Sequence, residues 1–208
     1  LDKDRAKLSK RKHGEKVSLS YYIKKGYLPQ ATANFLALLG WNPGTSQEIF
    51  TLDDLVQQFN IKKIQKGGAI FNEEKMKWVN KEHIKLLPPE ETSNEIYKII
   101  KNHYDTDIEY TKKISPIILD RINSFGDVSG IIEMGEIDFF FKRPDYEKGS
   151  LKWKGDSDIG IVKTHLERVE SLLGEISEEQ FTFDNIKNAL FSYAEQMGKG
   201  SVLLPLRL

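Results

Sequence analysis

The sequence predicts a mainly α-helical protein made of two or three small packed units. Over most of its 208 residues, apolar side chains recur at spacings of three and four, the period of one face of an α-helix. Residue types that begin and end helices bracket these stretches. Alternating strand patterns are scarce, and the two short candidates are residues 69–71 and 202–204. The predicted fold class is therefore mainly α, with minor short β.

The first two predicted helices lie between residues 18 and 40. Ser18 can cap the first helix and Gly26 can end it, because glycine accepts the left-handed backbone that often follows a helix. Pro29 can begin the second helix, since the first turn needs no backbone N–H from it, and Gly40 can end that helix. The apolar stripes are Leu19, Tyr22 and Ile23 in the first, and Thr32, Phe35, Leu36 and Leu39 in the second.

Two further helices are predicted before residue 87. Thr51 and Asp54 have the spacing of a capping box, in which each side chain bonds the backbone of the other. Asn72 can cap the helix that follows. The apolar stripes are Leu52, Leu55, Val56 and Phe59 after Thr51, and Met76 and Val79 after Asn72.

Pro88 and Pro89 interrupt the helical pattern, and we expect a domain boundary there. Thr92 and Glu95 are spaced as another capping box. Pro116 is predicted to open the next helix. The stripes that follow are Ile96, Ile99 and Ile100, and then Ile118, Ile122 and Phe125.

Residues 142–144 form a second candidate boundary, because Pro144 follows two cations. Ser157 is predicted to cap a helix that Gly174 ends, and Thr182 to cap a last helix that Gly198 ends. The stripes of these helices are Val162, Leu166, Val169 and Leu173, and then Ile186, Leu190, Tyr193 and Met197.

Composition excludes several classes of protein. The chain has no cysteine, so it has neither disulfides nor thiolate metal sites. No apolar run approaches the roughly 20 residues of a membrane-spanning helix, and the basic amino terminus lacks the apolar core of a secretory signal. The net charge is zero, yet residues 3–16 and 61–85 are mainly basic while residues 87–147 are mainly acidic. Such zones allow one face to bind a polyanion, although on charge alone solvated helix faces are the better explanation.

Few residues suggest catalysis or metal binding by their spacing alone. The four histidines are far apart, and none has metal-ligand spacing with a second histidine. No pair of carboxylates stands out as a general acid and base, and no Walker-type or dinucleotide-type glycine pattern appears. No metal site is therefore predicted.

Three sets of basic residues could contact RNA or a polyphosphate. Aromatic and basic residues interleave at 21–25 and 75–78, where stacking and charge could act together, although amphipathic helices with buried rings explain both stretches. Arg121 lies at the edge of an apolar stripe and Arg207 follows Pro205 and Leu206. Each could present a guanidinium to a base edge, or simply extend its stem over the core. The basic segment around Lys10 could reach a polyphosphate, or be a disordered terminus.

Residues 7–11, "KLSKR", resemble the second nucleotide-binding motif of class I aminoacyl-tRNA synthetases. The stretches "GYLPQATANFLALLGWNPG", "EIFTLDDLVQQF" and "GGAIFNEEKMKWVNKEHI" then follow in the order and spacing of bacterial-type glutamyl-tRNA synthetases. The helical remainder, which ends in "GKGSVLLPLRL", is similar to the anticodon-binding region of that family. The resemblance covers the whole chain, closely to about residue 87 and loosely over 88–198, while "SLKWKGDSDIG" at 150–160 falls outside the family pattern.

The resemblance implies a domain organisation. Residues 1–16 correspond to the nucleotide-binding loop and a linker, and residues 17–87 to the stem-contact domain. Residues 88–142 and 143–208 correspond to the two helical anticodon-binding subdomains, an α-helix cage, with the second one truncated. The family's first ATP-binding motif and its nucleotide-binding sheet have no counterpart here. We therefore expect a carboxy-terminal fragment in which residues 1–16 are poorly ordered.

The resemblance also implies an activity. The intact protein would be a glutamate–tRNA ligase that uses ATP and Mg²⁺, and Lys10 would be the catalytic lysine that stabilises the ATP phosphates. Lys7, Ser9 and Arg11 would complete the ATP-binding loop. Arg121 would read the third anticodon base, which suggests specificity for glutamate tRNA, and Arg207 would contact the anticodon as well.

Partners follow from the same resemblance. The chain is expected to bind tRNA-Glu and to be inactive alone, since glutamate and ATP would be held by an upstream domain. We expect a cytoplasmic monomer that binds no membrane. The alternative is a standalone RNA-binding module derived from a synthetase. The glutaminyl enzyme reads its anticodon with β-barrels and the paralogue that modifies tRNA-Asp has no anticodon domain, so both fit the predicted helices less well.

Overall fold

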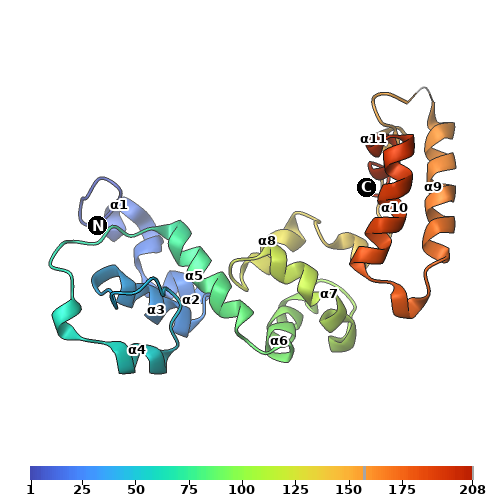
Figure 1. Ribbon diagram of the computed structural model, residues 1–208. Helices are drawn as coiled ribbons and strands as arrows, with labels where there is room; N and C mark the ends of the chain where they lie inside the picture. The colour runs from blue at the N-terminus through green and yellow to red at the C-terminus, as the bar shows by residue number, and fades with distance from the viewer. Residues whose placement is uncertain (157, 208) are drawn as a thin grey trace. The chain divides into compact units, whose positions relative to one another are not determined.

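The computed structural model describes residues 1–156 and 158–207, and α-helices dominate this part of the chain (Figure 1). The helices are α1 Lys10–His13, α2 Leu19–Lys24, α3 Pro29–Gly40, α4 Leu52–Gln58, α5 Glu73–Lys85, α6 Pro89–Ile100, α7 Ile108–Arg121, α8 Asp127–Glu133, α9 Ile159–Gly174, α10 Phe183–Met197 and α11 Lys199–Leu203. The chain divides into two compact units, Leu1–Phe141 and Lys142–Leu208. The mainly α fold class predicted from the sequence is confirmed.

The two predicted strands are wrong. Residues 69–71 belong to no strand, and residues 202–203 lie in α11. Val202 is buried because it faces the small core shared with α9 and α10. A helix can bury such a side chain as well as a strand can. Within the described residues, β pairing is limited to an isolated antiparallel bridge between Trp41 and Ile64.

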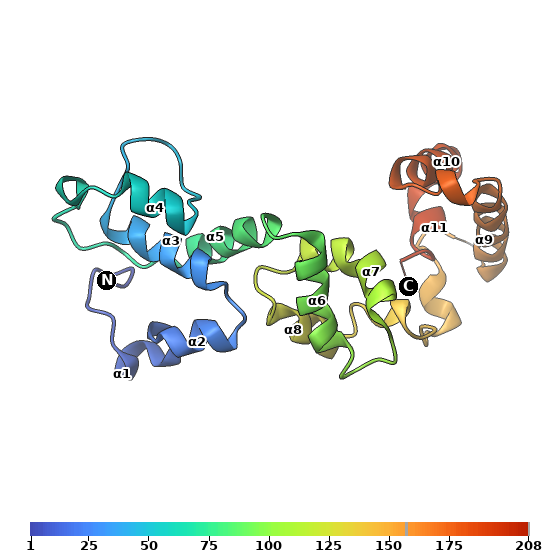
Figure 2. The same cartoon turned by 90° about the horizontal axis from the view of Figure 1, so that it is seen from below.

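The amino-terminal part of the first unit is built on α3 and α5 (Figure 2). Pro29 occupies the first turn of α3, Thr51 and Asp54 form the predicted capping box of α4, and the Asn72 side chain accepts a hydrogen bond from the backbone of Lys75 at the start of α5. These local predictions are confirmed. The core packs Tyr22, Ala31, Phe35, Met76 and Val79 in one cluster, and Trp41, Phe50 and Leu55 in a second.

The predicted apolar stripes in this part are only partly buried. The short helices α2 and α4 each bury one side chain, Tyr22 and Leu55 respectively. The remaining stripe residues that are exposed are Leu19, Ile23, Leu36, Leu52, Val56 and Phe59. A helix of six or seven residues can bury only about one side chain in a neighbouring core. The periodicity therefore predicts more buried side chains in α2 and α4 than the structure shows.

Helices α6, α7 and α8 enclose the largest hydrophobic core, which includes Ile96, Ile100, Ile118, Ile122 and Phe125. Two predicted helix starts are wrong. Helix α6 begins at Pro89, so Thr92 is inside it and its hydroxyl donates to the Pro89 carbonyl. Helix α7 begins at Ile108, where the side chain of Asp107 accepts from the backbone of Tyr110, and it continues through Pro116.

Backbone contacts join the two halves of the first unit. The amide nitrogens of Phe125 and Gly126 donate to the carbonyls of Gly26 and Lys25, at 3.3 and 3.1 Å. The Asn80 side chain accepts from the backbone of Leu28 and donates to the carbonyl of Asn123. These contacts explain why helices before and after Pro88 belong to one compact unit, while the division at residue 87 into functional domains stays a prediction.

The second unit is formed by α9, α10 and α11 around Val169, Ala194 and Val202. The predicted cap Ser157 lies outside the described residues, and Asp158 is the N-cap residue of α9. The side chain of Thr182 accepts from the backbone of Asn185 at the start of α10, and Gly198 follows its end with a φ of 105°, so both predictions are confirmed.

Candidate functional site

The basic segment predicted to reach phosphates lies at the start of the first unit. Ser9 is the N-cap residue of α1, and Lys10 and Arg11 form its first turn. The side chains of Lys7, Lys10 and Arg11 are exposed, and none makes an ion pair with the described residues. Their positive charges are therefore available to an anion.

Both ends of residues 1–16 contact the rest of the unit, while poor order of this segment stays a prediction. The backbone nitrogen of Phe71 donates to the carbonyl of Leu1, and Lys16 forms an ion pair with Glu73 at 3.1 Å. The imidazole of His13 lies 3.1 Å from Asp2. Backbone hydrogen bonds from Ala6, with contributions from His13 and Asp4, lower the pKa of Asp2 below its ordinary value, so its carboxylate stays charged.

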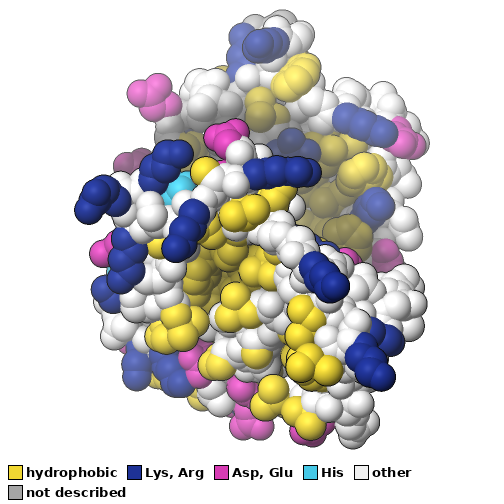
Figure 3. Space-filling model, turned by 90° about the vertical axis from the view of Figure 1, so that its left-hand side faces the viewer, with side chains coloured by type: hydrophobic (Ala, Val, Ile, Leu, Met, Phe, Trp, Pro, Cys, Tyr) yellow, Lys and Arg dark blue, Asp and Glu magenta, His cyan; other side chains and the backbone are white. Residues whose placement is uncertain are grey.

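An apolar hollow lies beside this segment. It has a volume of about 260 Å³, and its lining includes Leu8, Val17, Tyr22, Leu36, Phe71 and Met76. Figure 3 shows hydrophobic side chains gathered on the nearer face, with lysine and arginine side chains around them. Lys16 also lines the hollow, which therefore combines a mainly apolar lining with one cation.

Arg121 is the last residue of α7, and one nitrogen of its guanidinium contacts Glu136. Its Nη1 donates to the carbonyl of Glu136 at 3.2 Å and lies 3.8 Å from the carboxylate of the same residue. The side chain stays 39% exposed. A guanidinium has five N–H donors, so most of them remain available to a partner in solvent.

Arg207 lies in the second unit, after α11. Its backbone nitrogen donates to the carbonyl of Leu204 at 3.0 Å, which forms a turn, and the residue is exposed. The two arginines therefore belong to different units, each at the end of a helical segment packed on its own core.

The histidines serve structural roles where the structure shows their partners. His83 is buried beside Asn34, and His165 bonds the hydroxyl of Tyr193. Among residues 1–156 and 158–207, no three His, Cys, Asp or Glu side chains are grouped so that they could hold a metal ion. No helix in the same ranges is long and apolar enough to cross a membrane.

Sequence reasoning missed a set of exposed aromatic residues in the second unit. Phe183 and Phe191 lie on α10 with Lys187 between them, and Trp153 lies against α11. The spacing of four between the α10 residues could have been recognised in the sequence. The contact of Trp153 with Gly200 could not, because it joins residues far apart in the sequence.

Two family models match most of the chain. Residues 1–78 match the family described as "tRNA synthetases class I (E and Q), catalytic domain", and residues 95–208 match "Anticodon binding domain". The chain therefore belongs to the anticodon-binding-domain family of the class I tRNA synthetases.

Similar individual proteins are glutamate–tRNA ligases. The one from Clostridium acetobutylicum is 34% identical over 97% of this chain and 40% of its own length. The one from Chloroherpeton thalassium is 34% identical over 100% of this chain and 42% of its own length. The crystal structure of a glutamate tRNA ligase from Elizabethkingia meningosepticum in complex with its amino acid matches 98% of this chain and 42% of that chain, with a TM-score of 0.69 and 28% identity. This chain thus spans about 40% of the length of these relatives.

Proposed function

We propose that the chain is the tRNA-binding portion of a glutamate–tRNA ligase, which attaches glutamate to tRNA-Glu in the cytoplasm with ATP as the energy source. The observation that carries this proposal is the match of the whole chain to glutamate–tRNA ligases, with an anticodon-binding domain over residues 95–208. The basic first segment and the exposed arginines at helix ends agree with it. We propose that the chain acts as a monomer.

Arg121 and Arg207 are the residues we assign to the anticodon. Phosphate contacts position an RNA but carry no sequence information, so discrimination requires side chains that reach base edges. The guanidinium of Arg121 suits this task because Glu136 fixes one nitrogen and leaves the rest of the planar fork exposed.

Lys7, Ser9, Lys10 and Arg11 are the residues we assign to ATP. Their exposed cations and hydroxyl fit a triphosphate, whose charge grows on the leaving pyrophosphate during adenylation. Mg²⁺ would neutralise part of that charge when bound. The described residues of this chain offer no cluster of metal ligands, so we assign the ion to none of them.

Binding of tRNA-Glu and of an anticodon-swapped tRNA, at low and moderate salt, tests the proposal. Affinity should fall steeply with salt because each neutralised phosphate releases counterions. Arg121→Gln should lower the preference for the cognate anticodon by roughly five- to a hundredfold, the effect of about 1–3 kcal/mol at one base. Lys113→Gln, an exposed cation on the same helix, is the matched control and should leave the preference unchanged.

Two results would contradict the proposal. A folded chain that binds neither tRNA at low salt is not a tRNA-binding portion. Equal discrimination by the parent chain and Arg121→Gln would remove Arg121 from anticodon reading while leaving general tRNA binding in place.

A further inference from the structure

The second unit carries a series of aromatic and lysine side chains that the proposed function does not use. On α10, Phe183, Lys187 and Phe191 follow one another at a spacing of four, which places them as neighbours along one side of the helix. Nζ of Lys187 lies 5.7 Å from the ring centroid of Phe183 and 5.8 Å from that of Phe191. One ammonium group therefore lies near two exposed rings.

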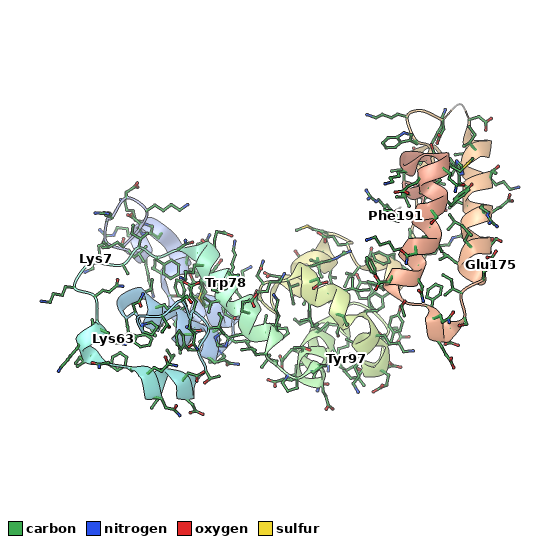
Figure 4. All side chains as sticks on the ribbon, viewed as in Figure 1. Lys7, Lys63, Trp78, Tyr97, Glu175 and Phe191 are labelled. Carbon is green, nitrogen blue, oxygen red and sulfur yellow. The ribbon has the colours of Figure 1, made fainter. Side chains whose placement is uncertain are left out.

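The series continues onto α11. Nζ of Lys199 lies 5.6 Å from the ring centroid of Phe191, whose place on α10 is marked in Figure 4. The next residue, Gly200, lies directly against the indole of Trp153, so closely that a Cβ atom there would overlap the ring at Cε2. The aromatic–lysine row is defined as Phe183, Lys187, Phe191, Lys199 and Trp153.

Trp153 is held in place. The carboxylate of Asp156 accepts hydrogen bonds from the backbone of Trp153 and from the hydroxyl of Ser201 on α11. Since Gly200 has no side chain, the indole packs onto the helix backbone. The ring is thus fixed on one side and still 43% exposed overall.

The exposure and charge of the row indicate what it would bind. Phe183 is 76% exposed and Phe191 37% exposed, although apolar rings of this size are usually covered. Lys187 makes no ion pair with the described residues, whereas Lys199 is paired with Glu195 at 3.0 Å. Aromatic rings interleaved with cations match the alternation of bases and phosphates along a single RNA strand.

We propose that the aromatic–lysine row binds an unpaired RNA strand, with bases stacked on Trp153, Phe191 and Phe183 and phosphates beside Lys187 and Lys199. The inference rests on the proposed function in one respect, because tRNA is the RNA it would contact. It adds a stacking surface in the same domain as Arg207 that accepts any base, since every base has a π face.

The test uses the full chain carrying Trp78→Phe, so that Trp153 is the exposed tryptophan and Trp41 is buried. Titration with a short oligoadenylate should quench the fluorescence of Trp153, and a fully paired RNA hairpin stem should not. Trp153→Leu and Phe191→Leu keep an apolar side chain but lose the ring, so each should weaken binding by roughly five- to a hundredfold. Trp153→Phe should lose less, and Glu195→Gln should tighten binding by freeing Lys199.

Thermal midpoints and circular dichroism identify variants that fail to fold, and Glu195→Gln then serves as an independent test. The inference is overturned if oligoadenylate leaves the fluorescence unchanged, if the leucine variants bind as tightly as the parent, or if oligoglutamate competes equally well, which would indicate a protein-docking surface. If the chain does not distinguish cognate from anticodon-swapped tRNA but oligoadenylate still quenches Trp153, the proposed function is contradicted and the row is not. If the chain distinguishes the two tRNAs but oligoadenylate causes no quenching, only the row is contradicted.

Discussion

At the scale of single residues, Arg121 and Lys10 differ in how far the surrounding structure holds their side chains. Arg121 has one nitrogen bonded to a backbone carbonyl, which fixes the direction of the guanidinium without using its other donors. Lys10 has no such support and remains exposed at the start of α1. The two residues therefore suit different tasks: an oriented planar contact for Arg121, and a movable point charge for Lys10.

Lys10→Ala provides a prediction about catalysis. In the glutamate–tRNA ligase to which we propose the chain belongs, the rate of ATP–pyrophosphate exchange should fall by about 10²-fold, because one stabilising charge on the leaving group is lost. Lys3→Ala removes an exposed cation from the same segment, outside the residues assigned to ATP, and should have little effect. An unchanged exchange rate in Lys10→Ala would remove this lysine from the ATP site.

His83 makes stability depend on pH. Its Nε2 lies 2.9 Å from the Asn34 side-chain oxygen, which also accepts from the backbone of Phe50, so the neutral ring donates from Nε2. Burial lowers the pKa of His83 below its ordinary value of about 6.5. As pH falls through that ordinary value, the unfolded chain takes up a proton that the folded chain resists, so the free energy of unfolding should decrease.

Urea unfolding between pH 8 and about 5 checks this expectation. His83→Gln keeps an N–H donor for Asn34 and should flatten the dependence over the window below about pH 6.5. His103→Gln, at an exposed position, is the control for removing an imidazole. A parent chain and His83→Gln with parallel pH profiles would show that His83 does not contribute.

At the scale of helices, the sequence predicts contacts between near neighbours better than contacts that depend on the tertiary fold. The capping box of Thr51 and Asp54 and the caps at Asn72 and Thr182 join groups within three residues, so the sequence can predict them. Thr92 and Glu95 have the same spacing but form no cap, because α6 already begins at Pro89. The starts of α6 and α7 differ from the prediction, because α6 begins at Pro89 and α7 at Ile108, before Thr92 and Pro116. Which apolar residues are buried depends on neighbours that periodicity does not reveal.

The contact between α8 and the end of α2 gives a matched pair of glycine substitutions. A Cβ atom at Gly126 would lie 2.5 Å from the carbonyl oxygen of Lys25, so Gly126→Ala must push the two backbones apart. We expect a loss of about 1–3 kcal/mol in the free energy of unfolding. Gly130 lies inside α8 with open space around it, and Gly130→Ala should gain about 0.5–1 kcal/mol. Denaturant unfolding of both variants measures the difference, and similar values would show that the close approach is unimportant.

At the scale of the whole molecule, the residues that we assign to ATP and RNA are divided between two compact units. Arg121 and the basic first segment belong to residues 1–141, and Arg207 and the aromatic–lysine row to residues 142–207. The amino-acid sequence was enough to single out residues 7–11 and both arginines, because the family resemblance lies in the residues around them. It could not locate Glu136 beside Arg121, or Gly200 beneath Trp153, because those contacts are made only after the helices pack.

The division into two units predicts that the connection between them contributes to tRNA binding. If each unit holds part of one tRNA, the second contact forms within a bound complex at a high effective concentration. A protease site inserted between Pro144 and Glu147, which are exposed, allows the same protein to be compared before and after cleavage. Cleavage should weaken the binding of tRNA-Glu by tenfold or more while the circular dichroism spectrum is unchanged, since each unit has its own core. Equal affinity for tRNA-Glu before and after cleavage would mean that one unit carries all of the binding. The arginine assigned to the anticodon in the other unit, Arg121 or Arg207, would then make no contribution to affinity.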